Sequence, residues 1–124
     1  MITIEKKEAP SDKDIRGFLG DIDFELPEGF MEFFSQSNGA LINGKSVYIE
    51  LWPLTDMVKL NKGYEVDEYA PGFFIFGSNG GGTAYFFEKK TGYIYDREFI
   101  AMPEDAVFIC KSFTEFLQNP PSYG

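Results

Sequence analysis

The chain has 124 residues, a length that suits a single domain with one hydrophobic core. It carries 20 acidic and 11 basic side chains, a formal charge of -9, which repels phosphate backbones and anionic lipid. We therefore expect neither nucleic acid nor a membrane surface as a direct partner. The absence of histidine removes the commonest general base and metal ligand. No catalytic residue, metal or cofactor is predicted.

The single cysteine, Cys110, lies in the apolar run 106–110 and is interpreted as a small hydrophobic residue. The N-terminus lacks the apolar region and the small-residue cleavage site of a secretory signal, and no stretch has the length of a membrane span. These features predict a cytoplasmic protein.

Two helices are predicted in the N-terminal third of the chain. Ser11 and Asp14 have the spacing of a helix N-cap and its acidic partner, and apolar residues then recur at helical spacing until Gly20. Pro27 suits the first turn of a second helix, whose apolar face carries three phenylalanines. Gly39 is predicted to end this helix.

A β-hairpin is predicted over residues 40–52. Asn43-Gly44 favours a two-residue turn, and apolar residues alternate along the strand that follows. Residues 54–63 have the apolar spacing of a short helix. Residues 64–72, which are rich in carboxylates and tyrosines, are predicted to form a surface loop.

Phe73–Gly77 and Ala84–Glu88 read as paired strands across a glycine-rich turn, followed by a strand at 93–95. The continuous hydrophobicity of 106–110 predicts a strand buried on both faces. Ser112 and Glu115 are predicted to form a capping box at the start of a last helix.

These elements predict an α+β fold, with helices packed against a mixed or mainly antiparallel sheet of about five to six strands. No internal repeat or change in composition marks a second domain. Residues 1–124 are therefore taken as one domain, with residues 1–10 and 119–124 as loose ends.

The segment Gly77–Thr83 superficially resembles a phosphate-binding loop. It lacks the Gly-Lys-Ser/Thr ending and leads into a strand, so no helix N-terminus would face an anion. We interpret Asn79, Gly80, Gly81 and Gly82 as a structural turn in which glycine permits positive φ.

Two groups of acids were candidates for other chemistry. Asp21, Asp23 and Glu25 have the spacing that opens a calcium-binding loop, but Leu26 stands where that loop requires glycine. They are interpreted as a solvated linker.

The second group, Glu50, Glu88, Asp96 and Glu98, could supply a carboxylate pair from neighbouring strands. Because the chain has 20 acids, some proximity is expected by chance, and solvated side chains are the favoured interpretation.

The stretch from Tyr64 to Tyr69 interleaves tyrosines with carboxylates, a composition that suits recognition of a basic partner. Tyrosine can anchor a contact while acids steer the approach. The candidate partner-binding residues are Trp52, Tyr64, Glu65, Asp67, Glu68 and Tyr69. The alternative is a polar connection whose tyrosines pack back on the sheet.

The order of motifs along the chain resembles the SUKH superfamily. The resemblance is carried by Leu26-Pro27 opening a helix that ends at Ser37-Asn38-Gly39, by Pro71-Gly72 before the segment 74–82, and by the final helix 112–117. This superfamily includes fungal cell-wall synthesis regulators of the Smi/Knr type and bacterial immunity proteins of polymorphic toxin systems. Asn79 departs from the pattern, since members often have an acid there.

The resemblance implies an α+β fold and no particular enzymatic activity. It favours an immunity protein that neutralises a cognate toxin, a basic nuclease domain, by stoichiometric binding. A non-catalytic regulatory adaptor is the alternative, and a small carboxylate-based enzyme or ligand-binding domain is a third hypothesis. The protein is expected to be a monomer or a weak homodimer.

Overall fold

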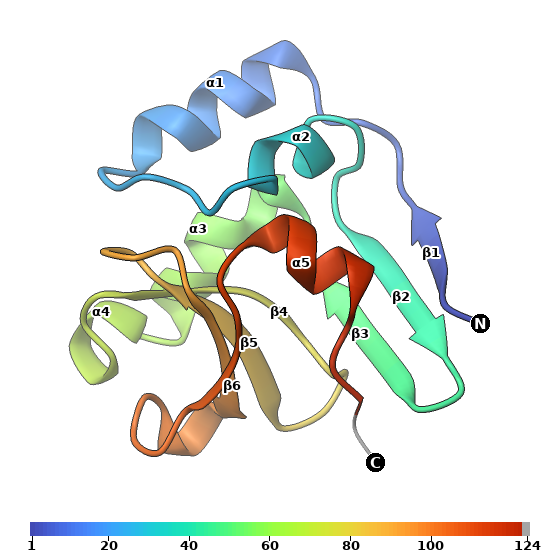
Figure 1. Ribbon diagram of the computed structural model, residues 1–124. Helices are drawn as coiled ribbons and strands as arrows, with labels where there is room; N and C mark the ends of the chain where they lie inside the picture. The colour runs from blue at the N-terminus through green and yellow to red at the C-terminus, as the bar shows by residue number, and fades with distance from the viewer. Residues whose placement is uncertain (123–124) are drawn as a thin grey trace.

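The computed structural model describes residues 1–122, which form a two-sided α+β fold around one antiparallel sheet (Figure 1). Within these residues the sheet has seven strands, and each pairs with the next along the chain. The strands are β1 (Thr3–Lys6), β2 (Ala40–Gly44), β3 (Val47–Leu51), β4 (Phe73–Ser78), β5 (Thr83–Glu88), β6 (Ile94–Glu98) and β7 (Val107–Cys110). The helices are α1 (Asp12–Asp21), α2 (Phe30–Phe34), α3 (Leu54–Gly63), α4 (Val66–Tyr69), the 3₁₀ helix η1 (Phe99–Ala101) and α5 (Phe113–Gln118). The predicted α+β class is confirmed, although the sheet has more strands than the sequence indicates.

Phenylalanine rings form the core between the sheet and the helices α2 and α5. The ring centroids of Phe30 and Phe34 in α2 lie 5.3 and 5.5 Å from that of Phe113 in α5. The Phe113 centroid lies 5.4 Å from that of Phe76 in β4. All four side chains are fully buried. Each such burial contributes about 1.5–3 kcal/mol, so this cluster fixes both helices on the sheet.

Local capping signals place two helices where the sequence predicts them. The Ser11 hydroxyl accepts a hydrogen bond from the Asp14 amide at 3.0 Å, and the Asp14 carboxylate accepts one from the Ser11 amide at 3.2 Å. At the start of α5, the Ser112 hydroxyl accepts from the Glu115 amide at 3.1 Å. Both N-caps are thus confirmed, but among the hydrogen bonds of the described residues the reciprocal bond of a capping box is present at Ser11 and not at Ser112.

Helix α2 is shorter than predicted at both ends: it begins at Phe30, because Pro27 belongs to a turn, and it ends at Phe34 rather than at Gly39. Gly29, at φ 87°, precedes the first helical residue, Phe30. The Glu28 carbonyl accepts hydrogen bonds from the amides of Phe113 and Thr114 at 2.9 and 3.2 Å. The chain therefore turns at residues 27–29 to hold the start of α5, a long-range contact with no local signal.

The β2–β3 hairpin also differs from the prediction. Its turn is Lys45-Ser46, because Gly44 pairs with Val47, and Asn43-Gly44 lies inside β2. The segment 1–10, expected as a loose end, contains β1, which pairs with β2. A Cβ on Gly44 would lie 2.6 Å from Ile2 Cδ1, so glycine here accommodates the N-terminal segment rather than a turn. At the other end, residues 123–124 of the predicted loose tail lie outside the described residues.

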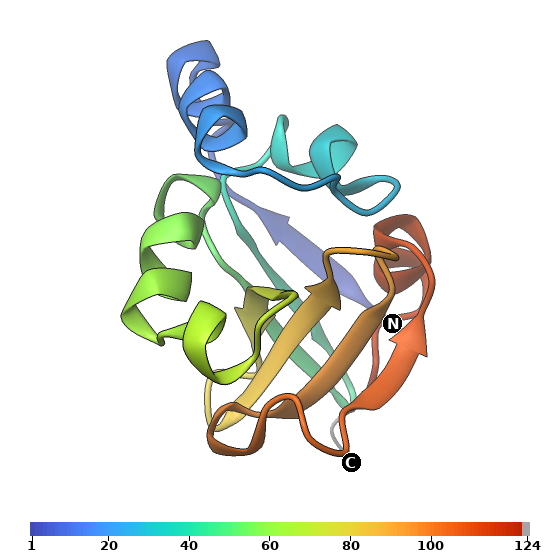
Figure 2. The ribbon, with the colours of Figure 1, turned by 90° about the vertical axis from the view of Figure 1, so that its left-hand side faces the viewer.

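Strand β7 is an edge strand, not a strand buried on both faces. It pairs only with β6 and lies beside α5 (Figure 2). Val107 and Phe108 remain 58% and 49% exposed. The hydrophobic run 106–110 therefore reflects an uncovered edge.

The predicted β4–β5 hairpin is present, with a bulge between Ile75 and Gly77. In its loop, the Asn79 side-chain oxygen accepts hydrogen bonds from the amides of Gly81 and Thr83 at 2.9 and 3.2 Å. Gly80 has φ +80°, and a Cβ there would lie 2.8 Å from the Tyr48 ring. The Ser78 hydroxyl accepts from the Gly80 amide at 3.2 Å, so the loop depends on two side-chain acceptors and on one glycine.

None of the helices within residues 1–122 combines the length and the apolar character needed to cross a membrane.

Candidate protein-binding site

The predicted surface loop 64–72 contains the short helix α4. Val66 and Ala70 are 5% and 1% exposed and lie one helical turn apart, so they bury a single apolar face against β4. The side chains of Tyr64, Tyr69 and the three intervening acids are exposed. The helix thus presents an acidic, tyrosine-bearing surface on an anchored backbone.

Three aromatic rings link this segment to η1. Tyr64 and Phe99 stack with centroids 4.7 Å apart and an interplanar angle of 19°. Trp52 lies nearly parallel to both, 5.9 Å from Tyr64 and 6.3 Å from Phe99. Trp52 is only 9% exposed, so it supports the surface from below, whereas Tyr64 is 49% exposed.

A groove opens between α4 and η1. We call it the apolar groove; its volume is about 360 Å³. Its lining consists of Tyr64, Val66, Tyr69, Ala70, Ile75, Phe99, Ile100 and Met102. Tyr69 and Ile100 at its rim are 66% and 95% exposed, an unusual exposure for large apolar or aromatic side chains that lie together.

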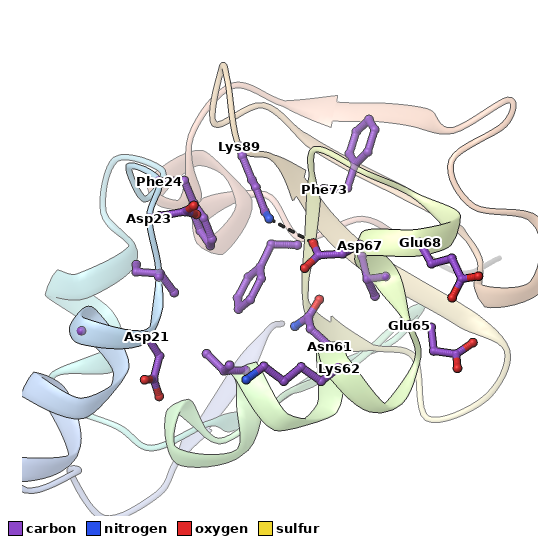
Figure 3. A pocket seen from close by; sticks show the side chains of 15 residues that line it. Asp21, Asp23, Phe24, Asn61, Lys62, Glu65, Asp67, Glu68, Phe73 and Lys89 are labelled. Carbon is purple, nitrogen blue, oxygen red and sulfur yellow. Dashed lines mark hydrogen bonds and ion pairs between the residues drawn. The ribbon is translucent and has the colours of Figure 1, made fainter.

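The three acids Glu65, Asp67 and Glu68 point in different directions. Asp67 points toward Lys89, whose ammonium lies 3.3 Å from the carboxylate, whereas Glu65 and Glu68 point away from this pair (Figure 3). The same ammonium lies 4.8 Å from the centre of the Phe24 ring. Asp67 is therefore engaged within the molecule, and Glu65 and Glu68 face outward.

The Lys89 pair lies in a second cavity of about 550 Å³, between the α1–α2 connection and the α3–α4 segment (Figure 3). Its walls include the predicted linker acids Asp21 and Asp23, together with the buried Asn61. The Asn61 amide donates to the carbonyls of Met57 and Ile75, both at 2.9 Å, and its oxygen accepts from the Ile75 amide at 2.8 Å. Asn61 thus ties α3 to β4 and leaves no polar atom free for a ligand.

The charge of the groove-forming segments has one sign. Residues 64–72 and 98–105 contain six carboxylates and no lysine or arginine, while Lys89 and Arg97 from outside these ranges pair with Asp67 and Glu98. The six acids, all exposed, are Glu65, Asp67, Glu68, Glu98, Glu104 and Asp105. The apolar groove therefore opens into a negative potential that would attract basic groups.

The acids considered for catalysis are spread over the sheet. Asp96 lies opposite Tyr85 on β5, and Glu88 lies opposite Phe73 on β4. Since Tyr85 and Glu88 are three residues apart on one strand, Asp96 and Glu88 point to opposite faces. Glu98 shares the face of Asp96, and Glu50 instead accepts a hydrogen bond from the Tyr48 hydroxyl at 2.8 Å.

Burial raises the pKa of the Asp96 carboxyl group. Burial also raises the pKa of the Tyr85 hydroxyl to about 12, and the nearby Asp96 charge contributes to this shift. Asp96 is the one member of this set that is clearly desolvated among the described residues. Within residues 1–122, the side chains of cysteine, aspartate and glutamate form no cluster of three or more that could hold a metal ion.

The structure adds Phe99, Ile100 and Met102 to the candidate site. No helix, strand or binding role is predicted for these residues from the sequence. A signal was present, because the run Phe99–Met102 is apolar and is bounded by Glu98 on one side and by Glu104-Asp105 on the other. Such a run in a connection between strands is typical of an exposed apolar contact.

A model of the SMI1 / KNR4 family (SUKH-1) matches residues 9–119. The match extends from the residues before α1 to the end of α5 and includes both segments that form the apolar groove. No curated protein sequence matches the chain.

Proposed function

Because the chain belongs to the SMI1/KNR4 family (SUKH-1), we propose that it is a non-catalytic immunity protein that neutralises a cognate toxin by stoichiometric binding in the cytoplasm. The observation that carries this proposal is the acidic surface around the apolar groove, with six carboxylates and no basic residue in its two segments. Apolar and aromatic side chains at the centre of a charged rim are typical of protein-binding surfaces.

The charge of the surface favours a basic partner. A nuclease domain that grips phosphate groups has a positive surface, and a protein of charge -9 is attracted to it at long range. An inhibitor that presents carboxylates to such a surface also occupies the positions that phosphate groups would take. A basic nuclease domain is therefore the partner that we propose.

The arrangement of the acids supports a binding role over a catalytic one. Asp96 and Glu88 face opposite sides of the sheet and would not share a substrate, and Glu98, which shares the face of Asp96, lies 3.8 Å from the Arg97 guanidinium. A glycosidase-type mechanism needs two carboxyl groups about 5–10 Å apart across one bond.

Coexpression tests the proposal. The toxin domain encoded beside the gene for this chain should arrest growth when it is expressed alone, and this chain should restore growth. Gel filtration of the mixture should show a complex with one copy of each protein. Loss of growth with both proteins present, together with two separate peaks, would falsify the immunity function for that pair.

A regulatory adaptor would use the same surface on a host protein. The coexpression experiment separates the two functions, because an adaptor does not protect against the toxin.

A further inference from the structure

We propose that the apolar groove receives one large apolar side chain from its partner, and that lysine or arginine residues flank this side chain on both sides. The inference rests on the proposed function for the positive charge of the partner. The apolar side chain of the partner would contact the groove between α4 and η1.

The exposure of the rim indicates an apolar contact. Ile100, Tyr69 and Tyr64 are 95%, 66% and 49% exposed, and they surround a floor formed by the buried Val66 and Ile75. Water contact with such side chains is unfavourable, and burial against a partner would remove it. The groove volume of about 360 Å³ is near the lower end of the range for small-molecule pockets. It therefore suits one side chain rather than a whole helix.

The groove is held in shape before binding. The Tyr64–Phe99 stack forms one wall, and the Phe99 amide donates to the Gly82 carbonyl in the β4–β5 loop at 2.9 Å. The Met102 amide donates to the Glu98 carbonyl at 3.1 Å, which closes η1. An entering side chain would not have to order these segments, so little entropy would be lost on their account.

The flanking charges select the partner. Glu65 and Glu68 belong to the segment that supplies Tyr64, Val66 and Tyr69 to the groove, and their side chains line the neighbouring cavity. Glu98 directly precedes Phe99 and lies 3.8 Å from the Arg97 guanidinium. A second copy of this chain would bring the same carboxylates against these and would be repelled. A basic segment would instead pair with them on both sides of its apolar residue.

Two synthetic peptides of about nine residues test the inference. Each has a Lys-Arg pair on either side of its central residue, which is leucine in one peptide and serine in the other. Binding is followed by the fluorescence of Trp52, the single tryptophan of the chain, and by backbone amide shifts. Burial of the leucine side chain should make the leucine peptide bind about 10-fold more tightly or better.

Substitutions at the rim of the apolar groove test whether the leucine peptide binds there. Ile100→Ser and Tyr69→Ser should each reduce the affinity for the leucine peptide at least about 5-fold. Val107→Ser, at an apolar position of 58% exposure on β7, is the matched control and should leave the affinity unchanged. A further leucine peptide with glutamine in place of its basic residues should bind more weakly.

Several results would overturn the inference: equal affinity for the leucine and serine peptides, no binding of either at millimolar concentration, or an equal effect of Val107→Ser. If the glutamine peptide binds as tightly as the leucine peptide with basic residues, the inferred role of the flanking lysine and arginine residues is wrong. These results leave the proposed function standing if the chain still protects against the toxin. Peptide binding without protection defeats the immunity function alone.

Discussion

The ring of Tyr64 lies against the ring of Phe99, with centroids 4.7 Å apart and planes inclined by 19°. Tyr64 follows α3 and Phe99 begins η1, so the stack joins two segments that are distant in sequence. Trp52 backs both rings, and the exposed half of Tyr64 forms part of the apolar groove. One aromatic contact thus contributes to the core and also shapes the candidate binding surface.

Replacement of Tyr64 by alanine should lower the free energy of unfolding by about 1 kcal/mol, because it removes the stack with Phe99 and Trp52. It should also shift the emission of Trp52 to longer wavelength as water reaches the indole. Tyr64→Phe keeps the ring and should change neither property. Denaturant unfolding followed by Trp52 fluorescence measures both, and equal damage from phenylalanine and alanine would contradict the role of the ring.

Asn61 is predicted to be the polar side chain whose loss costs most. Asn61→Ala leaves the amide and the carbonyl of Ile75 without their partners and should lower the free energy of unfolding by about 2 kcal/mol or more. The control is Asn43→Ala, at an exposed position in β2, which should stay within about 0.5 kcal/mol of the parent. Chemical unfolding of the two variants makes the comparison, and similar losses in both would show that the Asn61 bonds to β4 do not stabilise the fold.

Elements with local signals could be predicted from the sequence. Ser11 and Ser112 each supply a hydroxyl that satisfies an amide of the following helix, so the capping pattern alone locates α1 and α5. The start of α2 could not be found in this way. Its position depends on the contact between Glu28 and the amides of Phe113 and Thr114, which lie far along the chain.

In the β2–β3 hairpin and in the candidate site, too, local signals were informative and long-range contacts could not be predicted. Asn43-Gly44 has the composition of a turn, yet β1 pairs with β2 at Asn43 and draws both residues into the strand. Half of the candidate site, the acidic tyrosine-bearing segment, was visible in composition. The other half comes from η1, which is held against the first half by the Phe99–Tyr64 stack and by the hydrogen bond from the Phe99 amide to Gly82, contacts between segments distant in sequence.

Asn79 should tolerate aspartate but not alanine. Its side-chain oxygen accepts two amide hydrogen bonds, and a carboxylate can accept the same two. Asn79→Ala should lower the free energy of unfolding by about 1–2 kcal/mol, whereas Asn79→Asp should stay within about 0.5 kcal/mol of the parent. Thermal and chemical unfolding test this, and an aspartate variant as unstable as the alanine variant would show that the acceptor does not organise the loop.

The stability of the fold should fall at alkaline pH through Cys110. Burial raises the pKa of this thiol from 9.0 to about 11, so the folded chain keeps a proton that the unfolded chain releases. The stabilisation is complete below about pH 9 and is lost as the pH rises toward 11. Between about pH 8 and about pH 10.5, the free energy of unfolding of the parent should therefore fall relative to that of Cys110→Ala. Tyr85 titrates in both proteins and cancels, and a difference that does not change with pH would contradict the prediction.

Glu65 and Glu68 should control how fast the proposed toxin partner associates. The variant Glu65→Gln/Glu68→Gln removes two exposed charges from the segment that supplies Tyr64 and Tyr69 to the apolar groove, and its association rate should fall about 3–10-fold at low salt. Asp67 is left in place because it is paired with Lys89.

The control Glu5→Gln/Glu8→Gln removes the same charge from two exposed residues near the N-terminus and should slow association much less. Stopped-flow mixing at several salt concentrations measures the rates. The difference between the variants should disappear near 1 M salt, where screening acts over about 3 Å. Equal slowing by both pairs would mean that net charge alone steers the encounter, and the acids beside the groove would then have no particular part in it.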